Sequence, residues 1–102
     1  MPTAIIKIPK HEAKYAKKLL KLREASPDGK ECSCLIEWSA SFKDGFEAVI
    51  QVCNGDVGPW TQTILYDDRG NEVHFTEAGE DFLGECEFED EGKIYTVLSK
   101  IG

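Results

Sequence analysis

The hydrophobic pattern of this chain changes its period once, at residues 26–29, and this change limits the folds that the chain can adopt. Before it, apolar residues recur every three or four positions, as on one face of a helix. After it, apolar and polar residues alternate, as along a strand. Pro27 and Gly29 stop a helix and favour a turn. The sequence therefore predicts one N-terminal helix followed by β structure.

The helix is expected at residues 10–25, directly after Pro9, which fits the first helical position because its missing N–H group would have no partner there. The segment consists mostly of Ala, Leu, Lys, Glu and Arg, which favour helix formation. Helical spacing places its apolar residues on one face and four lysines in a stripe on the opposite face. The apolar face contains Ala13, Tyr15, Ala16, Leu19, Leu20 and Leu22, and the lysine stripe contains Lys10, Lys14, Lys17 and Lys21.

The remainder predicts about six strands joined by short turns, and short connections favour antiparallel neighbours. We therefore expect an α+β domain in which the N-terminal helix packs on an antiparallel sheet of about six strands. That sheet is expected to be a meander, either open, half-open or closed into a small barrel. Residues 3–8 are interpreted as an edge strand or an extended lead-in. The six strands are expected at residues 32–42, 46–53, 60–66, 72–76, 82–89 and 93–101.

A single domain is expected over residues 1–102, because this length suits one domain and no linker, repeat or low-complexity segment divides it. No stretch approaches the roughly 20 apolar residues of a membrane span, and the N-terminus has no signal-peptide pattern. We therefore expect a cytoplasmic protein without a membrane partner. In that compartment the four cysteines are expected to be reduced thiols: Cys32, Cys34, Cys53 and Cys86.

Charge is divided unevenly along the chain. Residues 1–30 contain eight basic and three acidic residues, whereas residues 31–102 contain four basic residues and sixteen carboxylates. Glu85, Glu87 and Glu89 alternate with Cys86 and Phe88, so on a strand they would form an acidic ladder on one face. Such a ladder repels itself unless a cation lies nearby or water screens it.

Three interpretations of this charge division are open. Both charged surfaces are simply solvated, the basic helix lies beside the acidic strands and neutralises them, or one surface binds a partner. In the last case the lysine stripe would engage an acidic partner, and the acidic ladder would engage a basic protein or a second copy of this chain. Nucleic acid is not an expected partner, since sixteen carboxylates oppose it and Tyr15, the one aromatic among the lysines, is assigned to the core face.

No metal or cofactor site is predicted. Cys32 and Cys34 are separated by one residue on a strand, whereas paired zinc ligands usually stand two to four residues apart on a turn. Alternation places both on the face of Ile36 and Trp38, so they are interpreted as core residues. His74 is interpreted as an exposed polar residue. Residues 67–72 (DDRGNE) lack the spacing of a calcium-binding loop, and residues 67–71 are better explained as a turn.

Catalysis is not expected, because no nucleophile motif is present and the many carboxylates define no unique acid–base pair. The leading hypothesis is a non-enzymatic interaction or regulatory domain that binds a macromolecular partner through its charged faces. One alternative is a small-molecule-binding domain with a pocket between helix and sheet, lined by Trp38 and Trp60. Another is an acidic inhibitor that mimics nucleic acid.

Overall fold

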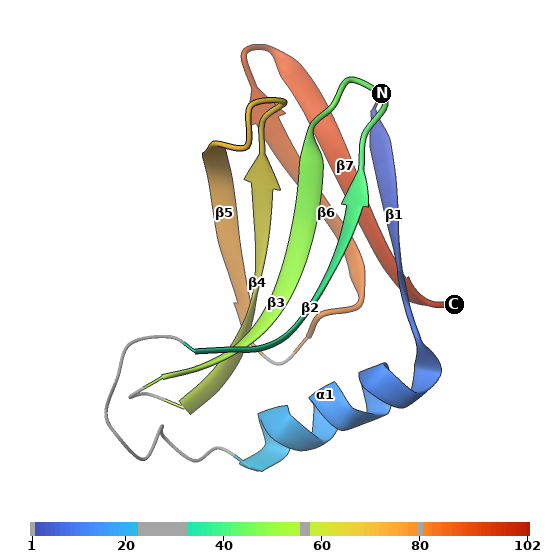
Figure 1. Cartoon of the computed structure of the whole chain (residues 1–102), viewed down its shortest axis with the longest axis vertical. Coiled ribbons are helices and arrows are strands. Elements are labelled where there is room, and N and C mark those ends of the chain that lie inside the picture. The colour runs from blue at the N-terminus through green and yellow to red at the C-terminus, as the bar shows by residue number, and fades with distance from the viewer. Residues whose placement is uncertain (1, 23–32, 56–57, 80) are drawn as a thin grey trace.

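A computed structural model describes residues 2–22, 33–55, 58–79 and 81–102, and in this part of the chain it contains one helix and seven strands (Figure 1). The predicted α+β class and the single N-terminal helix are confirmed. The elements are β1 (Thr3–Ile8), α1 (Lys10–Leu22), β2 (Ser33–Ser41), β3 (Glu47–Gly55), β4 (Gly58–Tyr66), β5 (Glu72–Gly79), β6 (Gly84–Asp90) and β7 (Lys93–Ile101).

The strands form two sheets, so the prediction of one sheet of about six strands is wrong. Strands β2, β3, β4 and β5 form an antiparallel meander, and a second sheet has the order β1-β7-β6. In the second sheet β6 and β7 form a hairpin, and β1 pairs with β7 in parallel. Strand β6 pairs with β7 and not with β5. The meander therefore ends at β5, whose outer edge has no strand beside it in its sheet.

Strand β1 is an integral part of the core rather than a lead-in. Its side chains alternate between exposed and buried, which places Ala4, Ile6 and Ile8 inside. Its partner β7 is the last strand of the chain, so no local turn signal announces the pairing. The short apolar segment before the helix is therefore an edge strand with one buried face.

The two sheets pack face to face, and α1 lies across one end of the resulting sandwich (Figure 1). Ile6 and Val97 of the three-stranded sheet share one core with Ile50, Val52 and Leu65 of the four-stranded sheet. The helix adds Ala13, Ala16 and Leu20 to the same core. The helix therefore closes the end of the sandwich instead of covering one sheet.

The buried face of α1 differs from the predicted one. Ala13, Ala16 and Leu20 are buried, whereas Tyr15 is 54 % exposed, so its assignment to the core face is wrong. Alanine lets the helix backbone approach the strand ends closely, and the Trp38 indole N–H donates a hydrogen bond to the Glu12 carboxylate over 3.1 Å. Together these contacts set the rotation of the helix. Residues 23–25 of the predicted helix lie outside the described residues.

The strand boundaries agree closely with the prediction because the turns carry strong local signals. At the β4–β5 turn, Asp67 accepts hydrogen bonds from the backbone N–H groups of Arg69 and Asn71, each over 2.9 Å. Gly70 then adopts a φ of +81°, which favours glycine. The interpretation of residues 67–71 as a turn is confirmed, and β5 begins at Glu72. No helix in the described residues is long and apolar enough to span a membrane.

The two sheets lie close together where β1 runs beside β2, whereas β5 and β6, the outer members of the two sheets at the other side, form no backbone ladder with each other. We call this unpaired interval between β5 and β6 the seam. At one end of the seam the His74 ring lies 3.1 Å from the Asp90 carboxylate and stacks beside Phe88. On this side, therefore, side chains rather than a backbone ladder connect the two sheets.

Candidate functional site

The acidic ladder lies on the outer face of the three-stranded sheet. In β6 the side chains of Glu85, Glu87 and Glu89 are exposed, while Cys86 and Phe88 face inward, as the alternation predicted. The β6–β7 register places Leu98 opposite Glu85 and Ile94 opposite Glu89. The ladder therefore borders apolar side chains on a rigid hairpin.

No ion pair or hydrogen bond to the ladder side chains is present in residues 2–22, 33–55, 58–79 and 81–102. The lysine stripe is equally unpaired there: Lys10, Lys14, Lys17 and Lys21 are all exposed, and none of them contacts a carboxylate of the ladder. Neutralisation of the ladder by the helix is therefore not achieved by ion pairs within the described residues. The repulsion along β6 is left to water or to a partner.

The outer face of the four-stranded sheet differs, because its polar groups bond to one another. The Gln51 amide donates to the Glu37 carboxylate over 3.0 Å, and the Gln62 amide donates to the Gln51 oxygen over 2.7 Å. The Trp60 indole N–H in turn donates to the Gln62 oxygen over 3.4 Å. This face is internally satisfied, whereas the ladder is not.

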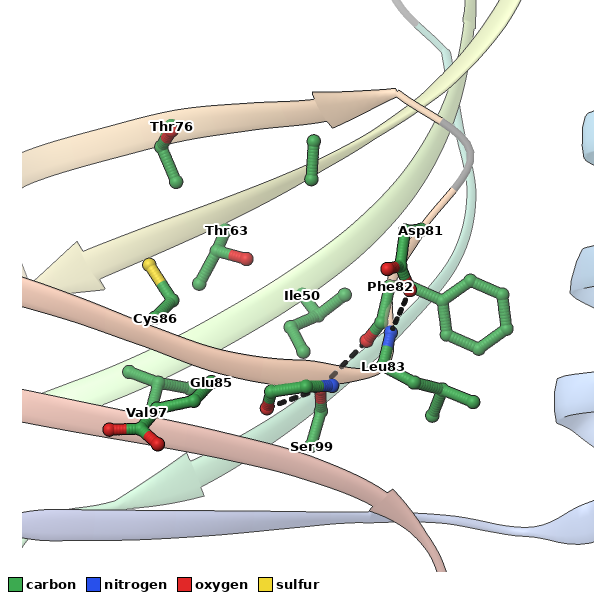
Figure 2. A pocket seen from close by; sticks show the side chains of 12 residues that line it. Ile50, Thr63, Thr76, Asp81, Phe82, Leu83, Glu85, Cys86, Val97 and Ser99 are labelled. Carbon is green, nitrogen blue, oxygen red and sulfur yellow. Dashed lines mark hydrogen bonds between the residues drawn. The ribbon is translucent and has the colours of Figure 1, made fainter.

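A pocket of about 330 Å³ lies behind the seam, between the two sheets (Figure 2). Its lining is apolar at Ile50 and Val97, which are almost fully buried. Thr63 is only 7 % exposed, and its hydroxyl has no hydrogen-bond partner in the described residues. Figure 2 shows Thr63 among the side chains that line the pocket. The pocket therefore combines an apolar wall with several polar groups, one of which is the Thr63 hydroxyl.

The loop that closes one end of the pocket is held by side chains. Ser99 donates its hydroxyl hydrogen to the Phe82 carbonyl over 2.7 Å and accepts a hydrogen bond from the Gly84 N–H over 3.0 Å. The Asp81 carboxylate accepts a hydrogen bond from the Leu83 N–H over 3.0 Å (Figure 2). These bonds fix the wall, so the pocket is a preformed feature of the fold.

Cys86 contributes a neutral thiol to the pocket. Burial raises its pKa, and the nearby charge of Glu87 raises the pKa further. A thiolate is the reactive form of cysteine, so this environment suppresses nucleophilic chemistry at neutral pH. Cys86 therefore acts as a small wall residue of the pocket.

The other predicted cysteines divide between the inside and the outside. Cys34 is exposed, so its assignment to the core is wrong: a register shift between Cys34 and Ile36 changes the face on which the earlier residue lies. Cys53 is buried, and Cys32 lies outside the described residues. In the part of the chain that the structure describes, no three His, Cys, Asp or Glu side chains are placed to hold a metal ion.

Trp38 and Trp60 do not line a common pocket. Trp38 is 7 % exposed and stacks on Phe82 with ring centroids 5.4 Å apart, so it fills the core. Trp60 lies at the start of β4 on the outer face, beside a shallow hollow that it shares with Pro59 and Glu77. The pocket at the seam has no signal in the sequence, because it depends on the separation of β5 from β6.

His74 is another residue that the sequence misplaced. It was expected to be an exposed polar residue, but it is half-buried and in contact with Asp90. The β4–β5 register puts it opposite buried Leu65, on the inner face, while Phe75 points outward and is 57 % exposed. The contact between His74 and Asp90 joins the two sheets and limits the length of the seam.

A separate polar cluster ties the β2–β3 turn to β7. One carboxylate oxygen of Asp44 accepts hydrogen bonds from the Lys93 ammonium over 2.9 Å and from the Tyr95 hydroxyl over 2.8 Å. Burial alone would raise the pKa of Asp44, but these hydrogen bonds, the Phe46 N–H and the Lys93 charge together lower it. Burial and Asp44 raise the pKa of Tyr95, so its hydroxyl remains a donor. The groups satisfy one another, which indicates a structural role.

Replacing Asp44 by alanine should therefore reduce the free energy of unfolding by about 1–3 kcal/mol near neutral pH, because the buried Tyr95 hydroxyl loses its acceptor. The lowered pKa of Asp44 means that its stabilisation is present above its ordinary value and is lost as the pH falls through the lowered value. The difference between wild type and variant in urea unfolding should thus shrink in acid. As a control, Asp68→Ala in an exposed turn should cost less than about 0.5 kcal/mol. A pH-independent difference would contradict this assignment.

No family model, no curated protein and no solved structure matches this chain. Its function therefore has to be argued from the geometry of the acidic ladder and of the pocket at the seam.

Proposed function

We propose that this domain is a non-catalytic binding module whose acidic ladder engages a basic protein partner. The observation that carries the proposal is that Glu85, Glu87 and Glu89 project from one strand with no cationic partner in the described residues. A strand presents these carboxylates about 7 Å apart in a fixed row. A basic partner would relieve their mutual repulsion and gain steering from their field.

Apolar side chains beside the ladder support a protein as the partner. Ile5 is 46 % exposed and Ile94 is 38 % exposed, and Leu98 lies between Ile5 and Glu85 in the strand register. Charge gives specificity and association rate, whereas apolar area supplies much of the affinity. A surface that offers both beside a rigid strand suits a protein segment better than a free cation.

Two special forms of this proposal differ in the identity of the partner. A second copy of this chain is basic at the exposed lysine stripe, so self-association would bring Lys14 and Lys17 of one copy to the ladder of another. A nucleic-acid-binding protein is a second form, in which the ladder takes the place of phosphates. Sedimentation at low salt identifies the first form, and displacement of the partner by duplex DNA identifies the second.

The proposal predicts salt-sensitive binding of cationic peptides. A fluorescent peptide of eight lysines should bind at low ionic strength, and its affinity should fall as salt is raised, because exposed charges are screened. A matched peptide of eight glutamates should not bind, since the ladder would repel it. Fluorescence anisotropy measures both. Equal binding of the two peptides, or affinity that does not change with salt, would remove the proposal.

A further inference from the structure

The seam combines two free strand edges with a pocket behind them. Neither β5 nor β6 has a backbone partner on the side that faces the other strand, because each ends its own sheet. Exposed strand edges are ready templates for pairing with another chain, and adding a strand to such an edge is a common mode of peptide recognition. In the fold described here, the pocket lies at this opening.

The inner side of the seam calls for an apolar side chain with a polar tip. Ile50 and Val97 provide an apolar lining, and the volume of about 330 Å³ is large enough for an aromatic ring. Thr63 places a free hydroxyl in this lining, although its side chain is more than nine-tenths buried. This hydroxyl makes no hydrogen bond to the described residues, so an occupant that bonds to it would be favoured over one that does not.

The outer side of the seam calls for positive charge. Glu77 of β5 and Glu85 and Glu87 of β6 are exposed on the strands that flank the seam, and no basic residue interrupts the sequence between Glu77 and Glu91. Side chains of an extended segment alternate between two faces. A segment paired with the free edge of β6 would therefore direct one side chain into the pocket and its two neighbours toward Glu85 and Glu87, whereas Glu77 lies on the outer face of the other sheet.

We propose that the seam of β5 and β6 receives an extended segment of the basic partner, with a tyrosine side chain in the pocket and a Lys or Arg on either side of it. This inference rests on the proposed function and names the mode of binding. The tyrosine ring would pack against Ile50 and Val97, and its hydroxyl would bond to Thr63. The basic neighbours would lie beside Glu85 and Glu87, and the backbone would pair with the free edge of β6.

Three peptides of five residues test the strand geometry. The first, acetyl-Lys-Val-Lys-Tyr-Lys-amide, alternates; the second has the same composition with its three lysines adjacent; the third is the first with N-methyl groups on alternate amides. In calorimetry the alternating peptide should bind about tenfold more tightly than the other two. Only this peptide can pair with a strand edge and place its tyrosine in the pocket at the same time. Equal affinities for all three would overturn strand addition while leaving a basic partner in place. Absence of binding by every peptide would overturn the proposed function as well.

The anchor is tested by a double-mutant cycle. Replacing Tyr by Phe in the peptide should weaken binding to the wild-type protein about three- to tenfold, the value of one hydrogen bond. In the Thr63→Val protein the two peptides should bind equally, because the acceptor is gone. Equal binding of the Tyr and Phe peptides to the wild type would overturn the assignment of tyrosine as the side chain in the pocket. Binding of p-cresol alone as tightly as the whole peptide would overturn it as well.

A pocket-filling variant completes the test. Cys86→Phe places a ring in the pocket and should reduce binding of the alternating peptide at least about tenfold, whereas Ser39→Phe on the exposed face of β2 should leave it unchanged. Circular dichroism melting checks that both variants fold. If Cys86→Phe does not fold, Thr76→Trp at the rim of the same pocket serves in its place. A folded, filled pocket that binds the peptide normally would overturn the inference.

Discussion

Replacing Ile6 by alanine should lower the free energy of unfolding by about 2–5 kcal/mol, which is a large part of the roughly 5–15 kcal/mol that stabilises a typical domain. Ile6 is completely buried in β1 and belongs to the core that both sheets share. Truncation removes apolar contact and leaves a cavity, because the parallel pairing of β1 with β7 limits how far the strand can move inward.

The neighbouring residue provides a matched control. Ile5 lies on the same strand, carries the same side chain and is 46 % exposed on the outer face. Ile5→Ala should cost less than about 1 kcal/mol, because much of its surface is already in water. Urea unfolding of both variants with an unchanged m-value measures the difference. Similar losses for the two variants would contradict the burial pattern of β1 and its place in the three-stranded sheet.

Reversing the charge of the acidic ladder should have the largest effect on binding. In the triple variant Glu85→Lys, Glu87→Lys and Glu89→Lys, affinity for the alternating peptide should fall about tenfold or more. Exposed ion pairs contribute about 0.2–1 kcal/mol each, and reversal replaces each attraction by a repulsion of similar size. Across three positions the change is therefore about 1–6 kcal/mol, compared with the roughly 1.4 kcal/mol that corresponds to a factor of ten.

A second triple variant separates the ladder from net charge. Reversal of Glu47, Asp68 and Glu72, near the β4–β5 turn, changes the net charge by the same amount at positions away from the seam. This variant should lose only a small part of the affinity, through its long-range field. Calorimetry at fixed salt compares the two variants. Equal losses would mean that the peptide responds to overall charge and that the ladder is not the contact surface.

Local patterns in the sequence predicted most of the secondary structure. The alternation of Glu85 and Glu87 with Cys86 and Phe88 predicted which side of β6 is exposed, and the structure agrees. Turn residues fixed the strand ends because Gly and Asp favour particular backbone conformations. These predictions succeed because their causes lie within a few residues of each other in the chain.

The wrong predictions concern residues whose positions depend on contacts with distant parts of the chain or on a local irregularity in a strand. Nothing near residues 3–8 shows that their partner is β7, about ninety residues later. Tyr15 was misplaced because two alanines, Ala13 and Ala16, form the close contact with the sandwich, and size rather than hydrophobicity selects that face. Cys34 was misplaced because one register shift reverses the face of a strand residue.

The candidate site likewise has one part that the sequence predicted and one part that it did not. The acidic ladder could be found in the sequence because it lies on one strand. The pocket could not, because Thr63, Cys86 and Val97 come from three strands and meet only where β5 and β6 remain unpaired. The predicted pocket residues Trp38 and Trp60 instead lie on opposite faces of the four-stranded sheet. An aromatic in a sequence does not show which sheet face it will occupy.

Titration of isotopically labelled protein with the alternating peptide tests the central claim most directly. In ¹H–¹⁵N spectra the binding account predicts that the largest shift changes occur along the seam, at Thr63, Thr76, Glu85, Cys86 and Glu87. It also predicts new protection from hydrogen exchange for amides on the free edge of β5 or β6. Shift changes confined to α1 or to the outer face of β2 and β3, with no added protection at the seam, would contradict it.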